Sequence, residues 1–275
     1  MVDETPLPDF DNPPVVEVAL GVQFQSLERL LTPHLGLLWG VFRSEFPIAE
    51  QYPPLAPARE EFGPSATPGV QIRFEEKQPT PRCWFLNNDK TELLQIQQDR
   101  FFHNWRKEGD DAEYPRYENI RSTFVARLRE FRRFVEKEDL GVFKPLLCEA
   151  TYVNNLDAGV GWDRPGQLGR VLACSKDQFS DSFLPEPEDT QMSFRFVIRG
   201  DDDDPIGRLH VLLNPMTRTS DGARKIQLRL MARTIPRSGD SDGIMSALDT
   251  GREWVVRGFA SITSEHMHEI WGRRS

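Results

Sequence analysis

The chain has 275 residues, 38% of them hydrophobic, and a formal net charge of −9 from 34 Lys+Arg and 43 Asp+Glu. Its 18 Phe and 6 Trp can supply a sizeable core, which excludes global disorder. No run of about 18 apolar residues occurs, and the start of the sequence is acidic and rich in proline, so we expect neither a membrane span nor a secretory signal. The negative charge also argues against nucleic acid as a partner.

The first half of the sequence predicts a strand, a helix, three antiparallel strands and a second helix. Residues 15–24 are rich in β-branched and aromatic side chains. Pro33 then opens a helical spacing of apolar residues that ends at Pro47. The proline-rich residues 47–69 predict a long irregular connection. The three strands are expected at 70–74, 83–86 and 92–98, and the second helix at 114–138.

The second half predicts nearly the same order. The expected elements are a strand at 146–154, a short helical segment at 164–174, strands at 192–198, 209–213 and 226–230, a helix at 244–262, and a final turn capped by Thr263 or Ser264. We therefore predict an α+β fold of two pseudo-repeated units, 1–142 and 143–275, in which antiparallel sheets pack against long helices. A single continuous domain remains an alternative.

The number and spacing of the cysteines indicate the cellular compartment of the protein. Cys83, Cys148 and Cys174 form an odd and widely spaced set. Such a set is typical of reduced thiols and does not resemble a disulfide framework. The sequence therefore predicts a cytoplasmic protein.

Two glutamates occupy matching places in the two predicted units. Glu17 and Glu149 each lie within an expected strand and have apolar neighbours. Facing carboxylates there could act as an acid/base pair or hold a cation. Alternatively, each points to the polar side of its strand and pairs with Arg73, Arg195 or Arg229, and we favour this second interpretation.

A polar strand face in the second half is a candidate ligand site. His210 is expected to share this face with Arg195, Gln227 and Arg229. The cluster could receive an anionic ligand, although a solvated sheet face has the same composition. We keep Arg195, His210 and Arg229 as binding candidates.

The expected helix over 114–138 carries a basic patch. Four arginines fall within an arc of about 120° beside the apolar stripe; they are Arg121, Arg129, Arg132 and Arg133. They could bind phosphates or an acidic partner. Glu118 and Glu136 fall in the same arc, so an intrahelical lattice of ion pairs, including Arg132 with Glu136, is the favoured alternative. We keep Arg129, Arg132 and Arg133 as partner-binding candidates.

The motifs that announce enzymatic chemistry are missing. The sequence contains no GxSxG, no P-loop, no GxGxxG and no CxxC pair. Nucleophilic hydrolysis, nucleotide binding and structural zinc each need such residues. The sequence therefore predicts no catalytic residue, no metal site and no cofactor.

Several landmarks give the chain a family resemblance. They are the PPVVEV segment from Pro13, the YPRYE segment from Tyr114, the CEATYVN segment from Cys148 and the IWG segment from Ile270. In these the chain resembles a sporadically distributed, functionally uncharacterised family of bacterial and archaeal proteins. The resemblance implies patchy inheritance, as in mobile or defence-type loci, but no activity, cofactor or site.

Two functions follow as hypotheses. The first is a non-enzymatic interaction protein that binds a protein partner or itself, such as an accessory or neutralising partner of a neighbouring gene product. The second is an enzyme or small-ligand protein with a cavity between the sheet and the terminal helix. We favour the first, because no polar constellation is concentrated in the sequence.

Overall fold

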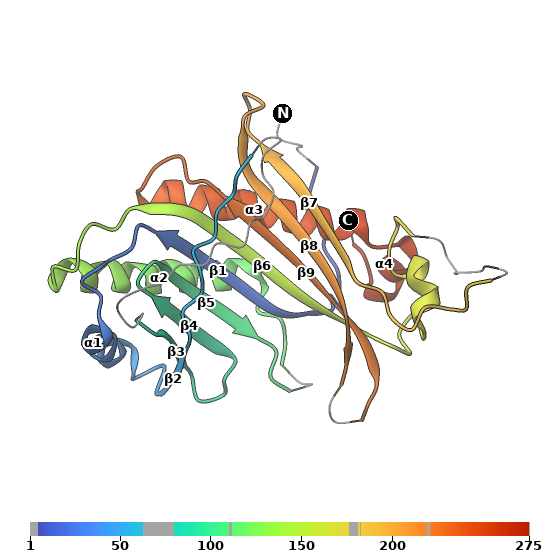
Figure 1. The fold of residues 1–275 in the computed structure, drawn as a ribbon, viewed down its shortest axis with the longest axis horizontal. Coiled ribbons are helices and arrows are strands. Elements are labelled where there is room, and N and C mark those ends of the chain that lie inside the picture. Colours follow the sequence, from blue (N-terminus) through green and yellow to red (C-terminus); the bar gives the residue numbers. More distant parts are fainter. Residues whose placement is uncertain are drawn as a thin grey trace. The chain divides into compact units, whose positions relative to one another are not determined.

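The computed structural model describes residues 5–62, 80–109, 112–175, 181, 183–218 and 221–274. Within these ranges the fold is α+β, as expected from the sequence, with nine strands in one antiparallel sheet and five helical segments (Figure 1). The strand order in the sheet is β2-β3-β4-β5-β1-β6-β9-β8-β7. No described helix combines the length and the hydropathy needed to cross a membrane.

The strands and helices have the following bounds. The strands are β1 (Val15–Phe24), β2 (Ile48–Tyr52), β3 (Arg82–Leu86), β4 (Glu92–Gln97), β5 (Arg100–Arg106), β6 (Pro145–Asp157), β7 (Met192–Arg199), β8 (Pro205–Thr217) and β9 (Arg224–Thr234). The helical segments are α1 (Thr32–Phe42), α2 (Arg116–Lys137), the 3-10 helix η1 (Pro165–Arg170), α3 (Ser241–Ile262) and α4 (Glu265–Trp271).

Two strands depart from the expected order. Strand β2 lies inside the segment expected to be irregular, where it pairs antiparallel with β3. Strand β5 was not expected and pairs with β4 through the short turn at Gln98 and Asp99. The strand expected at 70–74 lies outside the described residues, as does Arg73.

The chain divides into two compact units. Unit 1 comprises Met1–Glu17, Ala150–Ala232 and Asp249–Ser275. Unit 2 comprises Val18–Glu149 and Arg233–Leu248. Each unit takes segments from distant parts of the sequence, so both depend on long-range packing.

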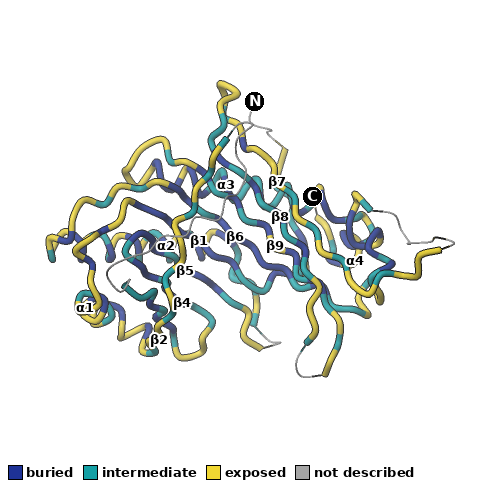
Figure 2. The backbone as a smooth tube through the Cα atoms, viewed as in Figure 1, coloured by how far each residue is buried: buried dark blue, intermediate teal, exposed yellow. Residues whose placement is uncertain are grey.

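In unit 2, one face of strands β3 to β5 is apolar. Cys83 pairs with Ile96, which pairs in turn with Phe101, so the three side chains share a face. The Phe101 ring stacks against Phe131 of α2 at 5.1 Å between centroids and lies 6.2 Å from Phe124. Helix α2 therefore covers this face, and its apolar stripe is buried there (Figure 2).

The opposite face of the same strands is polar and aromatic. Glu50, Trp84, Gln95 and Phe102 lie side by side across β2, β3, β4 and β5. Successive side chains of a strand point to opposite faces of the sheet, so the residues next to these four point to the apolar face. The sheet of unit 2 thus has one face for the core and one face of mixed chemistry.

In unit 1, the second half of α3 packs closely on the sheet. A side chain at Gly258 would lie 2.7 Å from Leu209 of β8, so glycine lets this helix approach the strand. The rings of Phe10, Phe259 and Trp271 form a cluster with centroids 5.1–6.1 Å apart. Ser264 caps α4 by accepting a hydrogen bond from the Met267 amide, which confirms one of the two expected caps.

Candidate functional site

The two predicted glutamates lie in separate units of the molecule. Glu149 in unit 2 accepts a hydrogen bond from Nε of Arg233 at 2.8 Å, and Arg233 also pairs with Glu60 at 3.4 Å. Glu17 is half-buried on the part of β1 that belongs to unit 1. Glu149 therefore pairs with Arg233, which was not among the three arginines expected from the sequence.

The candidates of the second half lie on the strands of unit 1. Arg195 on β7 is directly opposite His210 on β8. Residues that are opposite each other on neighbouring strands point to the same face of the sheet, as expected for this pair. Arg229 on β9 is exposed and donates to Gln227 at 3.4 Å. These side chains sit on the surface of β7 to β9 and line neither of the two pockets described below.

The arginines of α2 differ in their partners. Arg127 pairs with Glu45 and, at 3.2 Å, with Glu130. Arg129, Arg132 and Arg133 make no ion pair within 4 Å in the part of the chain that the structure describes. The expected pair of Arg132 with Glu136 is therefore not formed.

A pocket of about 270 Å³ in unit 2 brings these three arginines together. We call it the arginine pocket, and its lining residues are Val125, Leu128, Arg129, Arg132, Arg133, Glu136, Ser241 and Met245. Arg132 is held by a contact of 3.5 Å with Oγ of Ser241 and by the Phe143 ring, 5.2 Å from its guanidinium carbon. The pocket therefore combines apolar side chains with three guanidinium groups, and these two contacts hold the guanidinium group of Arg132 in place.

The carboxylate of Asp240 already caps the N-terminus of α3 beside the arginine pocket. Asp240 accepts a hydrogen bond from the Gly243 amide at 2.8 Å and another from the Ser238 hydroxyl at 2.7 Å. The Ser238 hydroxyl, the Gly243 amide and the charge of Arg132 hold the pKa of Asp240 below its ordinary value. A ligand of the arginine pocket would therefore meet the guanidinium groups and not the free end of the helix.

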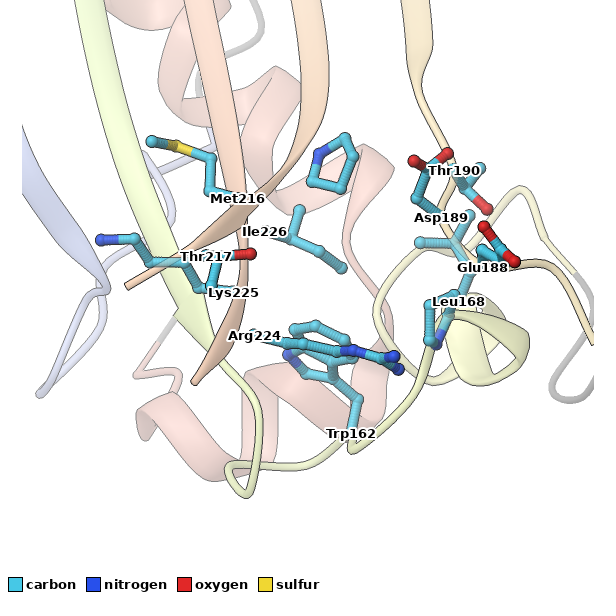
Figure 3. A pocket seen from close by; sticks show the side chains of 12 residues that line it. Trp162, Leu168, Glu188, Asp189, Thr190, Met216, Thr217, Arg224, Lys225 and Ile226 are labelled. Atoms are coloured by element: carbon cyan, nitrogen blue, oxygen red, sulfur yellow. The ribbon is translucent and has the colours of Figure 1, made fainter. Parts of the chain in front are cut away.

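A second pocket, of about 520 Å³, lies in unit 1 and is shown in Figure 3. We call it the Trp162 pocket, and its lining residues are Trp162, Pro165, Leu168, Glu188, Asp189, Thr190, Pro215, Met216, Thr217, Arg224, Lys225 and Ile226. The turn after β6, the helix η1, the segment before β7 and the ends of β8 and β9 each contribute. Sequence patterns did not indicate this pocket, since no local spacing joins such distant segments.

A proline-rich segment, residues 53–60, crosses the polar face of unit 2. The Gln97 side chain accepts from the Leu55 amide at 2.8 Å and donates to the Leu55 carbonyl at 2.9 Å. The Gln23 side chain makes the same two bonds with Ala58, at 2.8 and 2.9 Å. Buried amides therefore hold this segment through its backbone, as a neighbouring strand would.

The described residues contain no group of three His, Cys, Asp or Glu placed to hold a metal ion. Comparison with known proteins adds no function, because no family model, no curated protein and no solved structure matches the chain.

Proposed function

We propose that this protein is an interaction protein that binds an acidic segment of a partner protein at the arginine pocket. The observation that carries the proposal is the set of three arginines that surround one pocket without an ion pair to any described residue. In a chain with nine more acidic than basic side chains, such a group is not required for solubility. Carboxylates supplied by a partner would neutralise it.

The spacing of the arginines suits a ligand with more than one carboxylate. Arg129 and Arg133 are four residues apart on α2, and Arg132 lies beside them, so all three project from one side of the helix. Planar guanidinium groups bind carboxylates through paired hydrogen bonds. Two or three acidic side chains on an extended or helical segment would match this array.

The floor of the pocket adds an apolar contact. Val125, Leu128 and Met245 line it, and Leu128 is 5% and Met245 8% exposed. An apolar cavity rimmed by arginine is typical of the centre of a protein interface. The proposed partner segment therefore carries an apolar residue between its carboxylates.

A pair of labelled peptides tests the proposal by fluorescence anisotropy. One peptide alternates Glu with Leu, and the other has Gln in place of each Glu. We expect the Glu peptide to bind the full chain at low salt and to be released as salt rises, since exposed ion pairs are screened. The Gln peptide should not bind.

Two variants locate the binding. Replacing Arg129, Arg132 and Arg133 by Gln together should weaken binding about tenfold, as expected for the loss of ion pairs at the protein surface. Lys137→Gln removes a positive charge from the same helix outside the pocket and should leave the affinity unchanged. Failure of the Glu peptide to bind, equal binding by the Gln peptide, or tighter binding of a single-stranded oligonucleotide would each contradict the proposal.

We further propose that the chain arose by duplication of an α+β unit, with halves at 1–142 and 143–275. The sheet order supports this: in each half the first strand neighbours the last, β1 beside β5 and β6 beside β9. The helix α2 follows β5 and the helix α3 follows β9, which adds a second correspondence.

The thiols support a cytoplasmic location, which we also propose. Cys83, Cys148 and Cys174 are all free. Two of them, Cys83 and Cys148, are buried. Proteins of oxidising compartments are more often cross-linked.

A further inference from the structure

We propose that the Trp162 pocket binds a zwitterionic ligand, a free amino acid or a short peptide with an apolar side chain. This site belongs to unit 1 and shares no residue with the arginine pocket. Binding at the Trp162 pocket is therefore independent of the function proposed for the arginine pocket. It rests on a buried donor, on charges of both signs and on an apolar wall.

The buried donor is the indole N–H of Trp162. The residue is 3% exposed, and its Nε1 has no hydrogen-bond partner within the described ranges. A buried donor left unpaired costs about 1–3 kcal/mol. A ligand acceptor such as a carboxylate oxygen would remove that cost, because Trp162 lines the pocket.

Charged side chains of both signs line the pocket. Glu188, Asp189 and Arg224 make no ion pair within 4 Å among the described residues. Figure 3 shows the two carboxylates on one side of the pocket and Arg224 beside Trp162, while Lys225 extends away from them. A ligand with separated charges can place an ammonium at the acidic side and a carboxylate at Arg224 and Trp162.

Charged residues next to the pocket form ion pairs with one another, whereas Glu188, Asp189 and Arg224 form none with any described residue. Glu186 accepts from the Gly166 amide at 2.9 Å and pairs with Arg164 at 3.4 Å. Arg218 pairs with Asp157 at 3.1 Å. The Glu186 contacts fix the segment before β7 against η1, so Glu188 and Asp189 are held near the pocket while their carboxylates stay available.

The apolar wall supplies the side-chain preference. Pro165, Leu168 and Ile226 line the pocket, and Leu168 and Ile226 are 6% and 5% exposed. The volume of about 520 Å³ falls in the range of small-molecule sites, roughly 300–1,000 Å³. An aliphatic side chain would contact this wall while the charged ends reach the rim.

Isothermal titration calorimetry of the full chain with three probes tests the assignment. The probes are L-leucine, L-leucyl-L-leucine and the doubly capped N-acetyl-L-leucine amide. We expect binding of at least one of the two zwitterions and none of the capped compound, because capping removes both charges. Stronger binding of the dipeptide would identify a short peptide as the ligand, and stronger binding of leucine an amino acid.

Variants then assign each end of the ligand. Arg224→Gln should weaken binding about tenfold or more, and the double variant Glu188→Gln with Asp189→Asn should do the same. Arg199→Gln, on β7 and outside the pocket, is the matched control and should bind as the wild type does. Absence of binding by both zwitterions, equal binding of the capped compound, or binding that survives both pocket variants would overturn the proposal.

Discussion

The ring of Phe102 on β5 lies directly against Gly21 on β1. A methyl group at Gly21 would be 2.2 Å from Cδ1 and 2.3 Å from Cε1 of Phe102, closer than any carbon–carbon contact allows. Both residues belong to unit 2. Glycine at this position of a buried strand is therefore explained by the ring that covers it.

Replacing Gly21 by alanine should destabilise the protein. The added methyl group forces the Phe102 ring or the strand to move, and overpacking of this kind costs about 1–3 kcal/mol. Urea unfolding of Gly21→Ala measures the loss. Adding Phe102→Leu to the same chain should recover part of it, because the smaller side chain makes room.

A second glycine provides the matched control. Gly36 lies in α1, and a methyl group added there would have no atom within 4 Å among the described residues outside the helix's own backbone. Gly36→Ala should stabilise the protein by about 0.5–1 kcal/mol, since alanine is the better helix former. If both alanine variants change the free energy of unfolding in the same direction, the contact with Phe102 is not the cause.

The bonds between Gln97 and Leu55 predict a local effect on the proline-rich segment 53–60. Gln97→Ala removes both bonds and should lower the free energy of unfolding by about 1–2 kcal/mol. Because no strand among the described residues pairs with this segment, limited proteolysis should also cut it faster. Gln51→Ala, at an exposed position of β2, should change stability by less than about 0.5 kcal/mol. Equal cleavage rates in the two variants would refute this prediction.

The sequence predicted strand β1 with the bounds that the structure shows, because β-branched and aromatic residues fill most of it. Strand β2 was missed, since prolines flank it and its pairing with β3 is a tertiary feature. Strand β5 was missed because it carries Arg100, His103 and Asn104, which are buried although their side chains are polar. Long-range contacts decide both cases, and single-sequence patterns do not contain them.

For the candidate sites too, local spacing predicted one part of the structure and long-range contacts determine the rest. Helical spacing placed Arg129, Arg132 and Arg133 on one side of α2, and all three line one pocket. Spacing could not decide their ion pairs, because side-chain positions depend on the surroundings: Arg127 pairs with Glu45, 82 residues away. The Trp162 pocket could not be found in the sequence, since its walls come from segments up to 64 residues apart, from Trp162 to Ile226.

The three cysteines should differ sharply in reactivity. Cys148 is 0% exposed, and burial raises the pKa of its thiol to about 12. Burial also raises the pKa of Cys83, whereas Cys174 is exposed. In the native protein we expect one thiol to react promptly with Ellman's reagent and all three to react in denaturant. Cys174→Ser should abolish the prompt reaction, and a prompt reaction that persists in this variant would contradict the prediction.

His268 is held neutral in unit 1. Its Nε2 lies 2.8 Å from Oγ1 of Thr263, whose hydroxyl donates to the Phe259 carbonyl, so Nε2 is the protonated nitrogen. Arg273 donates to Nδ1 at 3.2 Å. Burial, and then the positive charge of Arg273, lower the pKa of His268 below its ordinary 6.5.

The lowered pKa of His268 predicts that stability falls in mild acid. Below pH 6.5 the unfolded chain takes up a proton that the folded chain still excludes, so stability is lost as the pH falls from there toward the folded pKa. Urea unfolding at about pH 8 and about pH 5.5 should show this loss, and His268→Gln should reduce it. His34→Gln, at the start of α1, is the control for the loss of a histidine as such. An undiminished loss in His268→Gln, or an equal reduction in His34→Gln, would assign the pH dependence to other groups.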